Sequence, residues 1–180
     1  MSYLTYPLDI SKILRLKKSI KKSLLATKDL VGKNIAVLGG STTAEITNIL
    51  ELFLLQNGIK PNFYESEYDK FYEDALFGNE SLDKFKPDII YIHTSVKNIT
   101  KFPSLGDSNE DVEVFVLDEI DKYKSIWRAL ERFDCPIIQN NFEYSENRSL
   151  GNLDCYDIHG KTYFINKINE QFSSAARVIT

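Results

Sequence analysis

One short segment of this chain combines the residue types and the spacing of an anion-binding or reactive site. Residues 34–45 consist of an apolar run, two glycines, Ser41, Thr42 and the first residues of a helical pattern. A strand that turns into a helix in this way presents the Ser41 hydroxyl and the amides of Gly40 and Thr42 at the carboxyl edge of a sheet, where open α/β proteins bind ligands. The positive end of the helix would stabilise an anion or a developing oxyanion there. A tight turn without any chemical role would need the same glycines, so both interpretations stay open.

Other polar residues follow the two apolar runs that come later in the chain. His93 ends one run, Asn98 lies in the loop after it, and Asn140 directly follows the other run. Strands of a parallel sheet end at the same edge, so we expect these side chains to share a crevice with Ser41. His93 could act there as a base, or it could make only a structural hydrogen bond at the strand end. We therefore predict Ser41 and His93 as catalytic residues, and Gly40, Thr42, Asn98 and Asn140 as ligand-binding residues.

The second histidine, His159, lies two positions after Asp157 in another polar loop. This spacing does not place both side chains on one face of a helix, so we expect capping or loop packing rather than chemistry. No pair of histidines or cysteines has metal-ligand spacing, so we predict neither a metal site nor a cofactor site in this chain. The glycines beside Ser41 also lack the spacing of dinucleotide-binding turns, of P-loops and of the hydrolase serine elbow.

The elements that must position these residues alternate along the chain. Apolar runs predict four strands, and helical periodicity predicts a helix after each of them. The expected strands lie at 34–38, 61–65, 86–93 and 136–139, and the expected helices at about 43–57, 68–76, 108–132 and 161–176. This alternation is typical of a parallel sheet with right-handed crossovers and helices on both faces. The predicted fold is therefore α/β, a three-layer, mostly parallel, doubly wound sheet of the flavodoxin-like kind.

Local signals define some of the boundaries of these elements. Thr42 and Glu45 have the spacing of a capping box, and Gly58 is expected to stop the helix that follows them. The segment 94–107 is longer than most connections, so it is a candidate functional loop. Residues 177–180 stand where a fifth strand would begin. We expect either that this strand is very short or that the sequence is a fragment of a longer protein.

The composition is that of an ordinary globular protein. The chain has 180 residues, of which 43% are hydrophobic and 27% charged, which suits one compact domain with a sizeable core. No apolar run is long enough to cross a membrane, and the start of the chain lacks the features of a signal peptide. Two cysteines are too few for a disulfide framework, so we expect reduced thiols in a cytoplasmic protein.

The charges are unevenly distributed along the chain, whose net charge is −4. Seven of the 22 basic residues and none of the 26 acidic residues lie between Ile10 and Lys28. Apolar residues recur there at helical spacing, which predicts a basic helix within residues 1–30 that precedes the α/β domain at 31–180. Such a helix could bind anionic lipid, nucleic acid or an acidic protein, or it could pack on its own domain. The acidic remainder of the chain argues against a nucleic-acid partner.

Several segments together resemble the amino-terminal domain of FkbH-like proteins, in particular the branch found with bacterial capsular polysaccharide genes. The resemblance extends over about residues 30–176. It rests on Ala-Val-Leu-Gly-Gly-Ser-Thr-Thr at 36–43, Pro-Asp-Ile-Ile-Tyr-Ile-His-Thr-Ser at 87–95, Cys-Pro-Ile-Ile-Gln-Asn-Asn-Phe-Glu-Tyr at 135–144, Leu-Gly-Asn at 150–152 and Tyr-Asp-Ile-His-Gly at 156–160. In that family the domain is similar to SGNH hydrolases, and a haloacid-dehalogenase-like (HAD) phosphatase or phosphotransferase domain follows it. The family is associated with making glyceryl units from a phosphorylated three-carbon acid and loading them on a carrier protein.

The motifs that are present limit what this resemblance implies for single residues. Ser41 matches the serine of the first SGNH block, and Asn98, or else Ser95, lies near the position of the third-block asparagine, although the usual Gly-x-Asn-Asp is absent. The Asp-x-x-His pair that completes an SGNH triad would follow a fifth strand, after Thr180. The Asp-x-Asp of HAD phosphatases is missing as well. The resemblance therefore implies magnesium only in a following HAD domain.

The function implied by the resemblance is that of an SGNH-like domain in a longer HAD-family protein, assisting acyl or glyceryl transfer or hydrolysis in capsular polysaccharide synthesis. Its substrate would be a small phosphorylated or carrier-linked acyl group. Two alternatives remain. The domain could be a non-catalytic module that docks an acyl carrier or partner protein through its basic helix, or it could bind phosphate or nucleotides at the same crevice.

Overall fold

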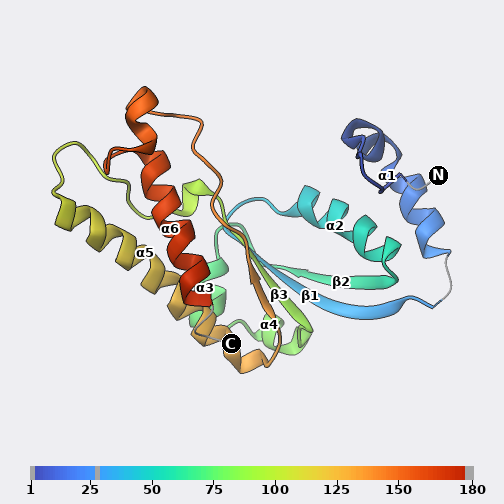
Figure 1. The fold of residues 1–180 in the computed structure, drawn as a ribbon. Coiled ribbons are helices and arrows are strands. Elements are labelled where there is room, and N and C mark those ends of the chain that lie inside the picture. Colours follow the sequence, from blue (N-terminus) through green and yellow to red (C-terminus); the bar gives the residue numbers. More distant parts are fainter. Residues whose placement is uncertain (1–2, 27–28, 177–180) are drawn as a thin grey trace.

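The computed structural model describes residues 3–26 and 29–176, which form a four-stranded parallel sheet with helices on both faces (Figure 1). The strand order is β2-β1-β3-β4, which is that of a doubly wound sheet, so the predicted fold class is confirmed. The strands are β1 Val31–Gly39, β2 Ile59–Glu65, β3 Ile89–His93 and β4 Ile137–Gln139.

Two layers of helices enclose the sheet. The helices are α1 Ile10–Leu25, α2 Ala44–Gln56, α3 Phe71–Leu76, α4 Glu80–Phe85, α5 Asn109–Leu130 and α6 Lys161–Ala176, with three short 3-10 turns, η1 Val96–Asn98, η2 Glu131–Phe133 and η3 Gly151–Cys155. In Figure 1, α1 and α2 lie on one side of the sheet, whereas α3, α5 and α6 lie on the other. Within the described part of the chain, none of these helices is long and apolar enough to span a membrane.

The two faces of the sheet are not covered equally. β1 is buried on both faces, since each side chain from Ile35 to Leu38 is at most 3% exposed. Along β3 the side chains alternate, so Ile90 and Ile92 are fully buried, whereas Tyr91 and His93 point to the opposite face and are only partly buried. On that face α2 packs against β2, and Ile138 of β4 is 52% exposed.

The main core lies between the sheet and the layer of α3, α5 and α6. Its centre is a group of aromatic rings around Phe172 of α6, whose ring centroid lies 4.9 Å from that of Tyr123 and 5.6 Å from that of Trp127. Phe142, from the segment after β4, packs on the same ring at 5.5 Å. Edge-to-face and tilted aromatic contacts of this kind hold α5 and α6 together and fix them over the sheet.

The basic helix α1 packs on its own domain, as one of the alternatives predicted. Ile13, Ile20 and Leu52 form a small apolar cluster between α1 and α2. Two lysines of α1 form ion pairs with acidic residues of α2. Lys17 Nζ lies 3.4 Å from Glu45, and Lys21 Nζ lies 2.6 Å from Glu51. These pairs are at the surface, so they add little to stability and mainly orient the helix.

The predicted capping box at the start of α2 is wrong. The helix begins at Ala44 with Thr43 at the N-cap position, and Thr43 makes no side-chain capping bond. Its hydroxyl instead donates to the Glu65 carboxylate at 2.5 Å, across to the end of β2. The Thr43 side chain is thereby directed toward the end of β2 rather than toward the amides of the first turn of α2.

The third strand starts later than predicted, and one helix was missed. Residues 80–85 form α4, whose cap Asn79 accepts hydrogen bonds from the amides of Ser81 and Leu82. Lys86 then takes a left-handed backbone conformation with φ of 50°, and β3 begins only at Ile89. The predicted stop at Gly58 is confirmed, because α2 ends at Gln56. The predicted fifth strand at 177–180 lies outside the described residues.

Gly160 gives a direct test of the packing at the start of α6. Asp154 is fully buried and accepts the Thr162 amide at 2.8 Å. A Cβ on Gly160 would stand 2.1 Å from the Asp154 carbonyl oxygen, so Gly160→Ala should lower the free energy of unfolding by about 3 kcal/mol. Gly106→Ala is the matched control, because a Cβ there meets nothing within 4 Å. Equal stabilities of the two variants in urea denaturation would contradict this account.

Candidate functional site

The carboxyl ends of β1 and β3 are joined directly at the predicted site. Gly39 is in register with His93, and the Gly40 amide donates to the His93 carbonyl oxygen at 2.8 Å. This bond extends the β1–β3 ladder by one residue into the turn. The Gly40 amide is therefore already used, and the role predicted for it in stabilising negative charge would require this bond to break.

Asn98 connects the loops that follow three of the strands. Its Nδ2 donates to the Gly40 carbonyl oxygen at 2.8 Å and to a carboxylate oxygen of Asp69, in the segment after β2, at 3.1 Å. Its Oδ1 accepts the Ser95 amide at 2.9 Å, which closes a capping box around η1. Both amide hydrogens are occupied, so Asn98 acts as a clamp, and a ligand could use it only by displacing one of these partners.

The second glycine of the turn is needed for this clamp. A Cβ on Gly40 would lie 2.5 Å from Asn98 Oδ1 and 2.6 Å from its Nδ2, closer than real Cβ contacts allow. The glycine thus permits a close approach between the first loop and the amide of the third. This gives the Gly-Gly pair a structural reason that does not depend on any ligand.

Ser41 and Thr42 remain available at the same edge. Ser41 is partly buried and Thr42 is exposed, immediately before the start of the 13-residue helix α2. Among residues 3–26 and 29–176 the Ser41 hydroxyl has no hydrogen-bond partner. A free hydroxyl beside the amino end of a helix can bind an anion or a polarised carbonyl oxygen.

His93 lies at this edge without forming a pair with Ser41. Its Nδ1 lies 3.0 Å from the Tyr91 hydroxyl, and the two rings are in contact. Burial lowers the pKa of the imidazole, and the nearby Glu143 carboxylate only partly opposes this effect. No hydrogen bond joins His93 to Ser41 in the described structure, so the catalytic roles of both residues stay predictions.

Asn140 holds the ends of β3 and β4 together. Its Oδ1 accepts the Thr94 amide at 2.9 Å, and its Nδ2 donates to the Thr94 carbonyl oxygen at 2.7 Å. The side-chain amide thereby copies a peptide group and continues the ladder between the two strands. A second donation to the Asn141 carbonyl uses the remaining hydrogen, so a ligand role for Asn140 would also require bonds to open.

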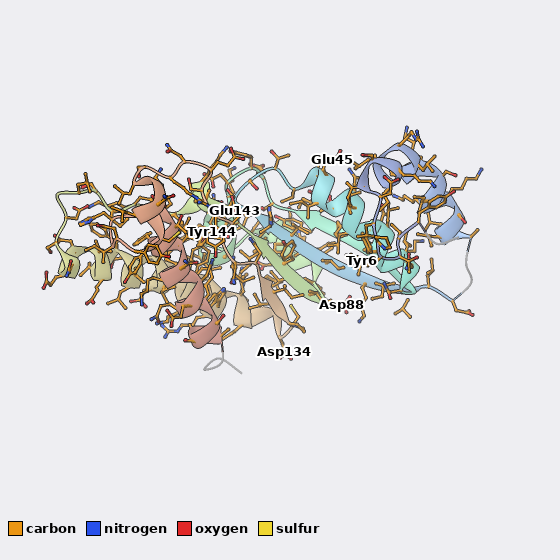
Figure 2. All side chains as sticks on the ribbon, turned by 45° about the horizontal axis from the view of Figure 1, so that its top comes forward. Tyr6, Glu45, Asp88, Asp134, Glu143 and Tyr144 are labelled. Carbon is orange, nitrogen blue, oxygen red and sulfur yellow. The ribbon has the colours of Figure 1, made fainter. Side chains whose placement is uncertain are left out.

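Several residues of this edge were missed in the sequence. The Ser66 hydroxyl accepts a hydrogen bond from the Gly39 amide at 2.8 Å. The Asp69 carboxylate accepts one from the Asn98 side chain, and the Glu143 carboxylate accepts one from the Val96 amide at 3.1 Å. Ser66 directly follows β2, so its position at a strand end could have identified it. Figure 2 shows Glu143 and Tyr144 at one end of the sheet, whereas Asp88 and Asp134, which precede β3 and β4, lie at the other.

His159 joins the two long loops next to this edge. Its Nδ1 lies 2.7 Å from an Asp157 carboxylate oxygen, and its Nε2 lies 3.0 Å from the Asp107 carbonyl oxygen. The predicted loop packing is confirmed, but the two side chains do meet, because the segment is a tight turn in which the His159 amide also bonds Asp157. A carboxylate and a carbonyl only accept hydrogen bonds, so both ring nitrogens of His159 must donate. The bond to the Asp107 backbone and the bond to the Asp157 side chain therefore raise the pKa of His159.

No group of three or more histidine, cysteine, aspartate or glutamate side chains in the described part of the chain could hold a metal ion. Cys135 and Cys155 are both free thiols. At the carboxyl edge the described residues present a hydroxyl, helix amides and carboxylates to a ligand.

Comparison with known proteins gives one informative match. No protein-family model matches the sequence, and no curated protein matches it either. The structure is similar, with a TM-score of 0.70, to the crystal structure of the N-terminal part of the protein BF1531 from Bacteroides fragilis, which contains a phosphatase domain and was solved in complex with Mg. The sequence identity is 18%, over 90% of this chain and 42% of the other. This likeness shows a shared fold, and the chain spans less than half the length of its structural neighbour.

The Asn98 clamp can be tested with a double-mutant cycle. Gly40→Ala should lower the free energy of unfolding by about 2 kcal/mol, because the new methyl group overlaps the Asn98 amide. In the Asn98→Ala background the same substitution should cost at least about 1 kcal/mol less, since the overlapping atoms are gone. Gly32→Ala, where a Cβ meets nothing within 4 Å, is the control. If the changes in unfolding free energy of Gly40→Ala and Asn98→Ala are additive, Asn98 does not make the proposed contact with the turn.

The His159 contacts predict a pH-dependent stability. The pKa of His159 is raised above 6.5 in the folded chain, so its stabilisation is complete below pH 6.5 and is lost as the pH rises through the folded-state pKa. Urea denaturation should show a fall in unfolding free energy above pH 6.5 that is absent in His159→Gln. His93→Gln is the matched control and should keep this fall, because the lowered pKa of His93 acts below pH 6.5. Identical pH profiles of the parent and His159→Gln would refute the assignment.

Proposed function

We propose that this chain is the amino-terminal, SGNH-like domain of an FkbH-like protein of the HAD superfamily. In this proposal it holds a small phosphorylated or carrier-linked acyl group for transfer or hydrolysis, in the cytoplasm, during capsular polysaccharide synthesis. Two observations support it. The sequence segments around Ser41, His93 and Asn140 resemble that family, and the fold is shared with the N-terminal part of BF1531, which contains a phosphatase domain.

The observation that carries the proposal is the Ser41 hydroxyl, which lacks a partner within the described residues at the amino end of α2. The Gly40–Asn98–Asp69 hydrogen bonds fix the backbone of the turn that carries the hydroxyl before a ligand arrives. Preorganised donors of this kind bind an anionic or polarised oxygen without reorganisation. The anionic or carbonyl end of the substrate would lie there.

The carboxylates near the turn argue for a small substrate rather than a nucleotide. Asp69 accepts a hydrogen bond from the same Asn98 nitrogen that donates to Gly40, and Glu65 accepts from Thr43 at the first turn of α2. A second anionic group beside these carboxylates would be repelled. Hydroxyl groups would be accepted, which suits a glyceryl unit with one anionic end.

The described residues favour binding at Ser41 over nucleophilic attack by it. A serine nucleophile needs a hydrogen-bonded base, and within the described residues the only side-chain hydrogen bond of His93 is that of its Nδ1 with Tyr91, so none joins it to Ser41. In this proposal Ser41 is a ligand of the substrate. The bond-breaking chemistry, and any magnesium that it needs, would belong to a phosphatase-like domain outside this chain.

A docking function is the second candidate, and the surface of α1 favours it. Lys17 and Lys21 pair with α2, but Arg15, Lys18 and Lys22 are exposed at spacings that place them on one side of the helix. An acidic acyl carrier protein could meet these three cations. Docking and substrate binding are compatible, because α1 contacts α2, whose first turn follows Ser41.

The Ser41 role can be measured by titrating the chain with glycerol 3-phosphate, a glyceryl unit with one anionic group, and following the amide signals of Ser41 and Thr42 by NMR. We expect Ser41→Ala to weaken binding about tenfold, the effect of losing one hydrogen bond to a charged group. Ser23→Ala, at an exposed position of α1, should bind like the parent. Unchanged affinity of Ser41→Ala would rule out the role. Binding of an acyl carrier protein without any binding of glycerol 3-phosphate would leave docking as the function.

A further inference from the structure

A buried ion pair of α5 contacts the loop that carries the Asn98 clamp. Glu119 is 3% exposed, and one oxygen of its carboxylate accepts a hydrogen bond from Lys122 Nζ at 2.8 Å. The second oxygen accepts the Thr100 amide at 3.0 Å. The segment that follows η1 is therefore bonded to a charged acceptor that belongs to a different element of the fold.

Lys122 binds the same loop segment directly. Its Nζ donates to the Asn98 carbonyl oxygen at 2.8 Å and to the Thr100 hydroxyl at 3.1 Å. Together with the Glu119 carboxylate, these acceptors use all three hydrogens of the ammonium group. The pair thus holds both ends of the segment from Asn98 to Thr100, and Ile99 between them is buried in the core.

The position of the ammonium group is itself fixed by the larger apolar core. Lys122 is followed directly by Tyr123, which is fully buried, and Lys122 Nζ lies 5.2 Å from the centroid of the Tyr123 ring. A cation at this distance from an aromatic face is attracted to it. Since Tyr123 also packs on Phe172 of α6, the donor that meets Asn98 is held by the same aromatic group that joins α5 to α6.

The cost of burying this pair argues that it does more than stabilise the fold. Transferring two charges from water into a core costs free energy that their mutual attraction often fails to recover, so apolar side chains of similar size frequently stabilise a core equally well. Apolar side chains, however, cannot donate to a chosen carbonyl oxygen. Asp121 and Lys124 form a pair of the same spacing on the same helix, but they are more exposed and make no hydrogen bond to a loop among the described residues.

We propose that Lys122 and Glu119 are positioning residues of the candidate site. Lys122 holds the backbone of Asn98, while the side chain of Asn98 donates to the Gly40 carbonyl oxygen at 2.8 Å. The turn that carries Ser41 is therefore connected, through one asparagine, to a buried ion pair of α5. The inference rests on the proposed function, in which Ser41 binds the anionic or carbonyl end of a small substrate.

The double variant Glu119→Gln/Lys122→Met tests the proposal. It removes both charges together, so no unpaired ion remains in the core, and the glutamine can still accept the Thr100 amide. Without the ammonium group, the side-chain amide hydrogens of Asn98 should exchange with solvent about tenfold faster, as followed by NMR. The affinity for glycerol 3-phosphate should fall by a similar factor, about tenfold, because the turn is no longer held before the ligand binds.

Two controls separate positioning from a general loss of charge. Asp121→Asn/Lys124→Met removes the surface pair of the same helix and should leave both the exchange of the Asn98 hydrogens and the affinity at their parent values. Lys122→Arg keeps a positive charge with several donors and should recover most of the protection and of the affinity.

Unchanged exchange of the Asn98 hydrogens in the double variant would overturn the proposal, and so would unchanged affinity for glycerol 3-phosphate. The exchange measurement needs no ligand, so it decides the inference even if the parent chain does not bind glycerol 3-phosphate, a result that would refute the proposed function alone. If the double variant does not fold, Lys122→Gln replaces it with the same expected outcomes, because its shorter side chain can donate to Glu119 but does not reach the Asn98 carbonyl oxygen.

Discussion

The arrangement at the carboxyl edge depends on one requirement, that the polar groups of the loops find partners where the strands end. Asn98 satisfies it for three loops at once, by donating to Gly40 and Asp69 and accepting from Ser95. Asn140 does the same for β3 and β4 by pairing with the Thr94 peptide group. Because these side-chain amides already have partners, Ser41 and Thr42 are predicted site residues whose hydroxyls are left to interact with a ligand.

The sheet could be predicted from the sequence because its strands are short apolar runs bounded by proline, glycine and asparagine. The order of elements then determined the topology, since right-handed crossovers leave few alternatives. α4 was missed because a six-residue helix has too few turns to show a period. The cap of α2 was predicted at Thr42 but lies at Thr43, whose hydroxyl bonds to Glu65, a residue 22 positions away that no local pattern identifies.

The location of the candidate site was predictable, but the hydrogen bonds of its residues were not. From the polar residues that follow each apolar run, we predicted that the Ser41 turn, His93, Asn98 and Asn140 lie at one edge of the sheet, and they do. Whether an asparagine amide is free or used depends on the distances between loops, which the sequence does not contain. The same reason explains His159 and Asp157, whose side chains meet because a turn, rather than a helix, separates them.

The two apolar clusters share no residue, and this separation has a dynamic consequence. The larger one binds α3, α5 and α6 to the sheet, whereas the smaller one joins α1 to α2 on the opposite side. Partial opening of a protein follows such divisions, since each cooperative unit unfolds with its own free energy. The layer of α1 and α2 can therefore loosen as a unit, displacing the helix that follows Ser41 while Asn98 and Asn140 keep the rest of the edge assembled. Exchange of the proposed substrate at this turn would then need only a minor sub-global opening, not unfolding of the whole domain.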